Sequence, residues 1–307
     1  MTSQIAVILN VKAGAGQNRR GEIERAFVDS GLAYRVLEAG DQRTAEEAAA
    51  EAINEGIDHL CACGGDGTVA KVVNAVMKSG RRDLLVSIVP MGTANLIAEV
   101  LGIPSEIQAA VKALRAGAVR EIDVGRIDEH YFVLGMGIGA TERFVTQTGD
   151  GSKKRLGRLA YVVSLLRQTG APLYQLQVEV DGKEVSPHHA EASTLANFWG
   201  TTHLKLLTDS CADDGKMELL VNERLTRWGL VRLIWYGLWG QLQRDEDVKV
   251  YQGASFRIGT EPSLPIQLDG NETDLRTPGN VEVLQRALRV CVFGEGSHNV
   301  GPQRRSG

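Results

Sequence analysis

The chain has 307 residues, of which 43% are hydrophobic and 23% charged, and its formal net charge is −4 at neutral pH. This composition supplies a full hydrophobic core and excludes a disordered or fibrous protein. Because a nucleic-acid binder carries a basic surface, the slightly acidic balance argues against a nucleic-acid partner. At this length two domains are expected.

The cysteines and the apolar segments indicate in which cellular compartment the protein is expected. No two cysteines form a CxxC pair or a zinc-type spacing, so reduced thiols in a cytoplasmic protein are expected. The start of the chain lacks the basic region and cleavage site of a signal peptide. No apolar run approaches the roughly 18 residues of a membrane-spanning helix, so no transmembrane segment is expected. The cysteines are Cys61, Cys63, Cys211 and Cys291.

Strand and helix patterns alternate through the first third of the chain. Thr44 is predicted as a helix N-cap, with Glu47 completing a capping box. Strands separated by helices of this length predict a parallel sheet covered on both faces, in an α/β domain over residues 1–122. The predicted strands are 5–9, 34–38, 59–63 and 84–89, and the predicted helices are 20–30, 44–55, one through Val73 and Val76, and one that ends at Leu101.

The pattern changes near Asp123. Short apolar stretches punctuated by glycine follow, and they predict a mostly antiparallel, sandwich-like β domain over residues 123–290. Asp181 and Gly182 are predicted as a two-residue hairpin turn. The tail 291–307 is not assigned to the β domain, and its return to the first domain is left open. The predicted strands include 131–134, 176–180, 195–198, 217–221, 255–258, 266–268 and 288–293, with helical patterns at 157–168 and 226–242.

Three of the parallel strands end in polar loops that contain glycine. Ligands of open parallel sheets bind at the carboxyl ends of strands, so these loops define one site. Consecutive glycines let the backbone approach a phosphate, and the N–H groups of the following helix favour an anion. The loop residues are Asn10, Lys12, Gly14 and Gly16 in the first loop, Gly64, Gly65, Asp66, Gly67 and Thr68 in the second, and Gly92, Thr93 and Asn95 in the third.

Asp66 places a carboxylate in this cradle. It would repel a polyphosphate unless it bound Mg²⁺ or took a proton from an attacking hydroxyl. The alternative is a plain glycine turn in which Asp66 is the N-cap of the next helix. Because both other loops also carry phosphate-compatible residues, we favour the functional interpretation.

Two common nucleotide motifs are missing from the sequence. It contains no GxxxxGK[ST] motif, which excludes a P-loop protein. Gly14 and Gly16 are followed by Arg19, where a dinucleotide fingerprint requires glycine or alanine, so a Rossmann site is not supported.

An asparagine loop after the first strand, GGDGT at 64–68 and PxGTxN at 90–95 together resemble the diacylglycerol kinase catalytic domain. That superfamily includes bacterial diacylglycerol and related lipid kinases, sphingosine kinases and ceramide kinases. GGDGT alone is also found in NAD kinases and phosphofructokinases, whereas the set in this order is specific. The similarity continues at 122–125, 131–139, 156–161, 212–217 and 267–270.

The resemblance implies an α/β nucleotide-binding domain that binds ATP, with a lipid hydroxyl received in the cleft beside a β-rich domain. It implies that Asn10 and Thr44 help to hold the nucleotide. It assigns Mg²⁺ and the attacking hydroxyl to Asp66 and to the acids of the last loop, Asp269 and Glu272. A structural magnesium site is also implied, at Asp214 with backbone oxygens near Cys211 and Lys216.

The sequence departs from the family pattern at several of these motifs. The proline that usually follows the first asparagine is Val11, the frequent aspartate after PxGTxN is Leu96, and a frequent glutamate after GGDGT is Lys71. The DGE motif reads Asp269-Gly-Asn271-Glu272. Either Glu272 supplies the carboxylate after a shift of one residue, or Asn271 fills the position and the base is lost; we favour Glu272.

The leading interpretation is therefore an ATP-dependent kinase that phosphorylates a lipid hydroxyl at a membrane surface. An NAD kinase and a nucleotide- or lipid-binding homologue with weakened catalysis are the alternatives. The sequence leaves open which lipid is the acceptor and whether the protein is a homodimer.

Two segments could contact a bilayer peripherally. A basic cluster at 153–155 adjoins an apolar helical face within 157–168, although a solvated turn before a core helix fits equally. Trp228, Trp235 and Trp239 fall at helical spacing, which suits a membrane interface or a packed core.

The histidines and two of the cysteines are interpreted structurally. His188 and His189 are predicted in a solvated loop beside Pro187, and His203 as a structural residue. Cys61 and Cys63 are predicted on one face of a buried strand, where they pack.

Overall fold

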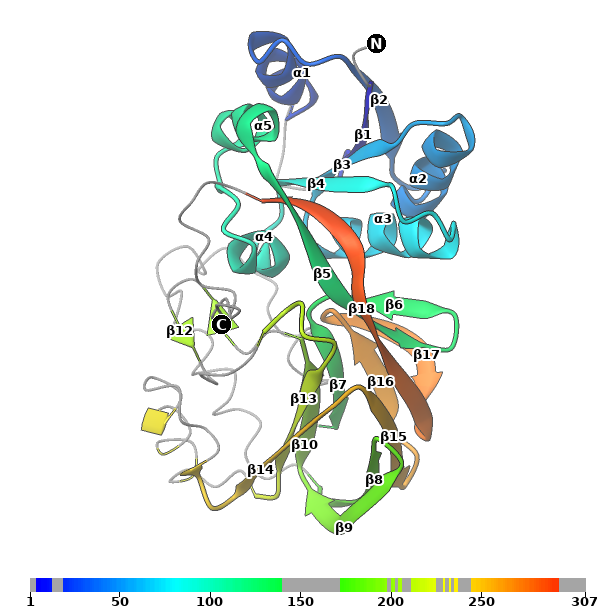
Figure 1. Ribbon diagram of the computed structural model, residues 1–307, viewed down its shortest axis with the longest axis vertical. Coiled ribbons are helices and arrows are strands. Elements are labelled where there is room, and N and C mark those ends of the chain that lie inside the picture. Colours follow the sequence, from blue (N-terminus) through cyan, green and yellow to red (C-terminus); the bar gives the residue numbers. More distant parts are fainter. Residues whose placement is uncertain are drawn as a thin grey trace, which may run out of the picture.

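The computed structural model describes residues 4–12, 19–139, 172–197, 200–201, 204–205, 211–224, 229, 232, 235–236 and 244–292. Figure 1 shows an α/β half followed by a β-rich half, which confirms the predicted fold class. The α/β half contains β1 (Ile5–Asn10), α1 (Arg19–Asp29), β2 (Tyr34–Ala39), α2 (Ala45–Asn54), β3 (His59–Gly64), α3 (Asp66–Lys78), β4 (Leu85–Pro90), α4 (Leu96–Val100) and α5 (Ile107–Ala116).

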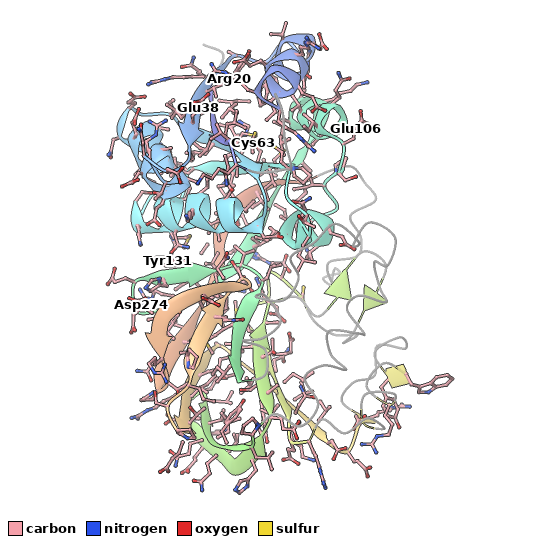
Figure 2. The ribbon with its side chains drawn as sticks, turned by 180° about the vertical axis from the view of Figure 1, so that it is seen from behind. Arg20, Glu38, Cys63, Glu106, Tyr131 and Asp274 are labelled. Carbon is pink, nitrogen blue, oxygen red and sulfur yellow. The ribbon has the colours of Figure 1, made fainter. Side chains whose placement is uncertain are left out.

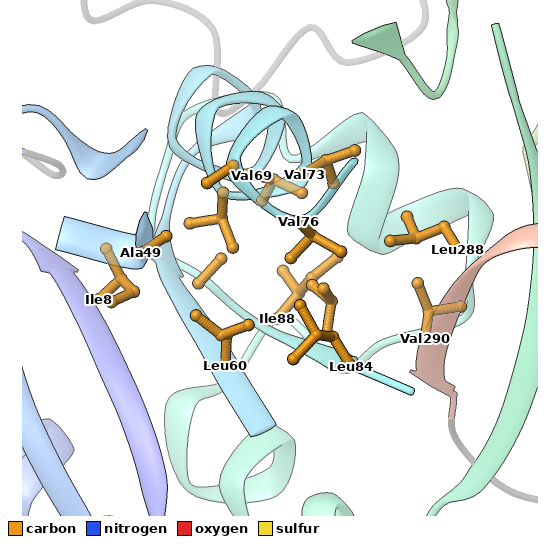
Figure 3. Close-up of a cluster of buried hydrophobic side chains, with 14 of the residues drawn as sticks. Ile8, Ala49, Leu60, Val69, Val73, Val76, Leu84, Ile88, Leu288 and Val290 are labelled. Carbon is orange, nitrogen blue, oxygen red and sulfur yellow. The ribbon is translucent and has the colours of Figure 1, made fainter. Parts of the chain in front are cut away.

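The strands of the α/β half pair in parallel in the order β2-β1-β3-β4. Successive side chains of a strand point to opposite faces of the sheet, so β1 contributes to two hydrophobic cores. Val7 packs with α1 and α5, whereas Ile8 packs with α2 and α3. Figure 3 shows the second of these cores, where Val69 and Val73 of α3 lie over the sheet. Helices therefore cover both faces of the sheet, as predicted.

The β-rich half packs a second, antiparallel sheet against the end of the first. The second sheet has the order β14-β13-β10-β7-β16-β17, and its core side chains meet those of β8, β15 and β18. The strands are β5 (Ala118–Ile127), β6 (His130–Phe132), β7 (Gly135–Gly139), β8 (Tyr174–Val180), β9 (Lys183–Ala190), β10 (Ala192–Ala196), β11 (Gly200–Thr201), β12 (Leu204–Lys205), β13 (Met217–Asn222), β14 (Val248–Gly253), β15 (Ser255–Glu261), β16 (Pro265–Leu268), β17 (Asn271–Arg276) and β18 (Gly279–Val292).

The predicted hairpin turn at Asp181 and Gly182 is confirmed. Both residues have positive φ, 50° and 76°, as a type I′ turn requires. Val180 pairs directly with Lys183 on either side of the turn.

Two long strands join the halves. β5 and β18 pair with each other and run from one half into the other (Figure 1). Near its end β18 pairs in parallel with β4 through Arg289 and Val290, and near its start it pairs with β15. The first sheet is therefore continuous from β2 to β9, and the division predicted at residue 122 falls inside β5.

Candidate active site

The three predicted loops meet at one edge of the sheet. β1, β3 and β4 are parallel and end at Asn10, Gly64 and Pro90, so the loops that follow lie side by side. Asn10 Nδ2 donates to Thr68 Oγ1 at 2.9 Å, which ties the first loop to the second. Met91 N donates to Gly64 O at 2.8 Å, which ties the third loop to the second. Gly14 and Gly16 lie outside the described residues.

The glycines of these loops allow backbone to pack on backbone. A Cβ atom added to Gly92 would lie 2.5 Å from the Cα of Gly65, closer than real side chains come. A Cβ atom on Gly64 would lie 2.3 Å from Thr68 Oγ1. Glycine is needed at position 92 to keep the second and third loops in contact, and at position 64 to leave room for the Thr68 side chain.

Asp66 connects the second loop to α4. It is the first residue of α3, and the N-cap is Gly65, so the alternative in which Asp66 is the N-cap is wrong. The Asp66 carboxylate instead turns to the neighbouring helix, where Oδ1 accepts from Ile97 N at 3.0 Å. Gly65 has the extended backbone of an N-cap, so Asp66 lies in the first turn of α3. From there its side chain reaches α4.

Asn95 shapes the third loop from within. Its Oδ1 accepts from Gly92 N and its Nδ2 donates to Gly92 O, both at 2.8 Å. Its own backbone is left-handed, with φ 51°, a conformation that asparagine tolerates better than most residues. Thr93 and Leu96 on either side are exposed, and Leu96 keeps 45% of its accessible surface.

Lys12 and Thr44 flank the same edge. Lys12 N donates to Asn10 Oδ1 at 3.0 Å, and its Nζ pairs with Asp41. Thr44 caps α2, accepting from Glu47 N at 3.2 Å and donating its own N–H to Glu47 Oε2 at 2.7 Å, so the predicted capping box is confirmed. The hydrogen bond from Thr44 N also lowers the pKa of Glu47.

The β-rich half brings Asp269 to this edge on a hairpin turn between β16 and β17. The buried carboxylate accepts hydrogen bonds from the N–H groups of Val133 at 2.9 Å, Leu134 at 2.7 Å and Gly135 at 3.0 Å. Burial raises the pKa of Asp269 to about 6; the three N–H groups oppose the rise, and the charge of Asp66 adds to it.

The same turn decides which residue meets the second loop. Asp269 and Gly270 have φ of 49° and 75°, and Leu268 pairs directly with Asn271, so the hairpin contains no extra residue at this point. Asn271 Oδ1 lies 3.1 Å from the position of a Cβ atom on Gly67. Side chains alternate along β17, which directs Glu272 to the opposite face. The structure thus places Asn271 beside the loop and not Glu272, which stands against the one-residue shift that we favoured.

The predicted structural metal site lies beside β5 and β18, where Asp123 N donates to Ala212 O and Arg286 Nε donates to Asp213 O. Asp214 Oδ1 accepts from Lys216 N at 3.0 Å, and Cys211 Sγ donates to Asp213 Oδ1 at 2.9 Å. Burial raises the pKa of Cys211 to about 11 and also raises the pKa of Asp214. Among the residues that the structure describes, no group of three His, Cys, Asp or Glu side chains is placed to hold a metal ion. Metal binding here stays a prediction.

Asp123 lies beside this group and was given no role from the sequence. Its buried carboxylate accepts from Gly215 N at 2.6 Å and from Arg286 N at 2.7 Å, at the irregularity in β18. Burial raises the pKa of Asp123 to about 6. The aspartate fixes the place where β18 passes from one half to the other.

The predicted membrane contacts are described only in part. The basic cluster at 153–155, the segment 157–168, Trp228 and Trp239 lie outside the described residues. Trp235 retains 62% of its accessible surface. Arg232 pairs with Asp245, Glu246 and Asp247. Within the described part of the chain, no helix is long and apolar enough to cross a bilayer.

The prediction for His188 is wrong. His188 is a buried residue of β9, where Nδ1 contacts Glu223 Oε1 at 2.8 Å and Nε2 contacts the Tyr251 hydroxyl at 2.6 Å. Pro187 is tolerated because β9 is the last strand of its sheet and is irregular opposite Gln177. His203 lies outside the described residues. Cys61 and Cys63 are buried on one face of β3, as predicted.

Comparison with known proteins gives the context of this site. Residues 4–127 match the diacylglycerol kinase catalytic domain, and residues 134–292 match the YegS C-terminal NAD kinase beta sandwich-like domain. A diacylglycerol kinase of Bacillus subtilis (strain 168) is 30% identical over 262 residues, which cover 83% of each chain.

Solved structures show the same fold. A diacylglycerol kinase from Bacillus anthracis strain Sterne superposes with a TM-score of 0.75 at 20% identity, covering 96% of this chain and 98% of that one. An NAD kinase from Archaeoglobus fulgidus, solved in complex with ATP, has a TM-score of 0.51 at 12% identity, covering 96% and 95%. The chain therefore belongs to the diacylglycerol kinase family, whose enzymes are phosphotransferases with an alcohol group as acceptor.

Proposed function

We propose that this protein is an ATP-dependent lipid kinase. It transfers the γ-phosphate of ATP to the hydroxyl of a lipid, of the diacylglycerol type or the sphingoid and ceramide type. The observation that carries the proposal is the meeting of the two halves at the GGDGT loop, where Asn271 of the β-rich half lies against Gly67, next to Asp66 in the sequence. Family membership supports the same reaction.

The second loop and α3 supply the phosphate site. The first N–H groups of a helix have no partner within that helix, and they attract an anion together with the helix dipole. The close contact of Gly65 with Gly92 holds the loop backbone in place before ATP arrives. The NAD kinase that shares this fold was solved in complex with ATP, which supports ATP as the ligand of this fold. Asn10, Lys12, Thr44 and Thr93 are the side chains that we assign to the same pocket.

In the transfer itself, the lipid hydroxyl oxygen forms a bond to the γ-phosphorus while the bond to the β,γ-bridging oxygen breaks and ADP leaves. Ile97 N–H holds Asp66 Oδ1, which leaves Oδ2 to receive the hydroxyl proton. Phosphoryl transfer depends mainly on positioning and on electrostatic stabilisation, so the reaction tolerates the neutral side chain of Asn271.

Mg²⁺ fits the chemistry of this pocket. When bound, it neutralises charge on the phosphate oxygens. Asp66 would hold it beside the phosphates through Oδ1, which accepts a single hydrogen bond, so that Oδ2 stays available to the hydroxyl proton. Asp269 is less suited, because it already accepts from three N–H groups of the chain. Asp269 orients the turn that faces the acceptor.

Asn271 also supports a second candidate, a nucleotide- or lipid-binding homologue with weakened catalysis. The amide stands where the family motif has a glutamate, and an amide cannot act as a base. Intact ATP affinity without turnover is the result that this candidate requires.

The test is incubation of the purified protein with Mg-ATP and a mixed lipid extract in micelles, with products identified by mass spectrometry. Asp66→Asn is the informative variant, because it keeps an oxygen for Ile97 N–H and removes the charge. Asp29→Asn, at the exposed end of α1, is the matched control. A new phosphorylated lipid formed by the wild type and Asp29→Asn but not by Asp66→Asn supports the proposal and identifies the acceptor. ATP binding without any lipid product overturns it, and phosphorylation of NAD instead would indicate an NAD kinase.

A further inference from the structure

Asn74 joins the middle of α3 to the β-rich half. Its Nδ2 donates to Tyr131 O at 2.9 Å, and its Oδ1 accepts from Tyr131 N at 3.1 Å. Nδ2 also donates to Ala70 O at 2.9 Å within the helix, which fixes the direction of the amide. Both backbone polar groups of Tyr131 are thus held by one side chain that is distant in the sequence. Asparagine is a poor helix former, so its place inside α3 does not follow from local preference.

The segment that Asn74 holds is followed directly by the residues that bind the Asp269 carboxylate. Tyr131 belongs to β6, and the residues just after β6 donate their N–H groups to the Asp269 carboxylate. Val133 packs into the core between α2, α3 and the sheet. A shift of Tyr131 would therefore move the N–H groups that fix the Asp269 turn.

The other end of that turn returns to α3. Asn271 follows Gly270 directly and lies against Gly67 in the first turn of the helix. Gly67 and Asn74 are about two helical turns apart. Figure 2 shows Tyr131 at the junction of the two halves, next to α3. Besides packing on its apolar face, α3 thus contacts the β-rich half through Gly67 of the GGDGT loop and through Asn74.

We propose that Asn74 is a positioning residue for phosphoryl transfer. It holds β6, and through β6 the Asp269 turn, at a fixed distance from Asp66, so that the acceptor side of the cleft is aligned before substrates bind. The proposal rests on the proposed kinase function for its catalytic consequence, whereas the contact with Tyr131 is independent of it. Misplacement of reacting groups by about 1 Å can cost roughly a hundredfold in rate, so a hydrogen-bonded spacer at this junction affects turnover.

The first test replaces Asn74 by leucine, which has a similar size but neither donates nor accepts. We expect kcat to fall by about 10- to 100-fold, with KM for ATP unchanged, because the loops at the sheet edge remain intact. Asn54→Leu, at the exposed end of α2, is the matched control and keeps the wild-type kcat. An unchanged kcat in a folded Asn74→Leu protein overturns the proposal, as does a loss that falls on KM for ATP.

A second variant distinguishes the loss of the hydrogen bonds to Tyr131 from a general loss of folding. In Asn74→Asp, the ionised carboxylate accepts from Tyr131 N but repels Tyr131 O, and protonation restores a donor. We expect the kcat of this variant, divided by that of the wild type at each pH, to rise as the pH is lowered. Asn54→Asp gives a constant ratio. A constant ratio for Asn74→Asp contradicts pairing through both groups of Tyr131.

Amide hydrogen exchange separates this inference from the kinase proposal. In Asn74→Leu, we expect faster exchange at Tyr131, Val133, Leu134 and Gly135, with the amides of β1 and β3 unchanged. If the wild type phosphorylates no lipid, the kinase proposal fails, and this experiment still decides whether Asn74 holds the turn. Unchanged exchange at these four amides would overturn the positioning role.

Discussion

The side-chain oxygen of Asn271 lies 3.1 Å from the position that a Cβ atom on Gly67 would occupy. Asn271 Nδ2 also lies near the carbonyl oxygens of Leu268 and Asp269, at 3.4 and 3.2 Å, which turns the amide oxygen toward Gly67. The amide nitrogen of Asn271 is therefore paired within its own hairpin. A carboxylate there would face two carbonyl oxygens and the buried Asp269.

Asn271→Ala is expected to lower kcat more than Glu272→Gln. The first removes a side chain that faces the GGDGT loop, whereas the second changes a side chain on the opposite face of β17. Steady-state kinetics with the lipid acceptor, run on both variants, provide the comparison. A larger loss with Glu272→Gln would restore the hypothesis of a one-residue shift.

Gly92→Ala is expected to destabilise the protein by about 1–3 kcal/mol and to weaken ATP binding, because the new methyl group would overlap Gly65. Gly259→Ala is the control, since its nearest neighbours would lie at 3.9 Å and its φ is not positive. Urea denaturation gives the free energy of unfolding, and titration with ATP gives the affinity. Equal effects of the two substitutions would contradict the close packing of the loops.

Asp269 is expected to make stability depend on pH. Its pKa rises from 3.8 to about 6 on folding, so its contribution to stability is full below pH 3.8 and is lost as the pH rises through 6. Relative to Asp269→Asn, the wild type should therefore lose about 2 kcal/mol of unfolding free energy between about pH 4 and pH 6, and about 3 kcal/mol in total by about pH 7. Urea denaturation at several pH values measures the difference. A difference that stays constant with pH would show that burial does not raise this pKa.

Trp235→Ala is expected to reduce activity on lipid presented in vesicles but not on a short-chain lipid dissolved as monomers. An indole ring favours the interface between water and a bilayer, and Trp235 is exposed. Leu173→Ala is the control, because Leu173 is another exposed apolar side chain of the β-rich half. Equal loss on both forms of the lipid would assign Trp235 to the active site or to folding and not to membrane contact.

The sequence was sufficient for the architecture and for the loops at the sheet edge. The alternation of short apolar strands with helices predicts the parallel sheet, because each strand needs helices on both faces. Strands that run in parallel must also bring their following loops to one edge. The meeting of Asn10, Gly64 and Pro90 therefore follows from topology alone.

The sequence also contains the information that orients the turn at Asp269 and Gly270. The dipeptide Asp181-Gly182 predicts a hairpin turn, and Asp269-Gly270 is the same dipeptide with φ values within 1° of those at the first turn. A two-residue turn pairs Leu268 with Asn271 and places Glu272 on the other face.

Other features depend on contacts that no local pattern contains. Asn74 and Tyr131 are separated by 57 residues, and nothing near Asn74 marks its partner. Pro187 predicts a loop at His188, but an edge strand has no neighbour on one side and can accept a proline there. In both cases tertiary position overrides the local signal.

The course of β18 has a consequence for how this chain can be divided. A fragment that ended at residue 127 would retain every helix of the α/β half but would leave β4 with a bare edge, since the strand that covers it enters from the far end of the sequence. An unpaired strand edge invites pairing with other chains. Truncation at that point should therefore yield an aggregating polypeptide, and any attempt to express the nucleotide-binding half alone would need β18 grafted back beside β4.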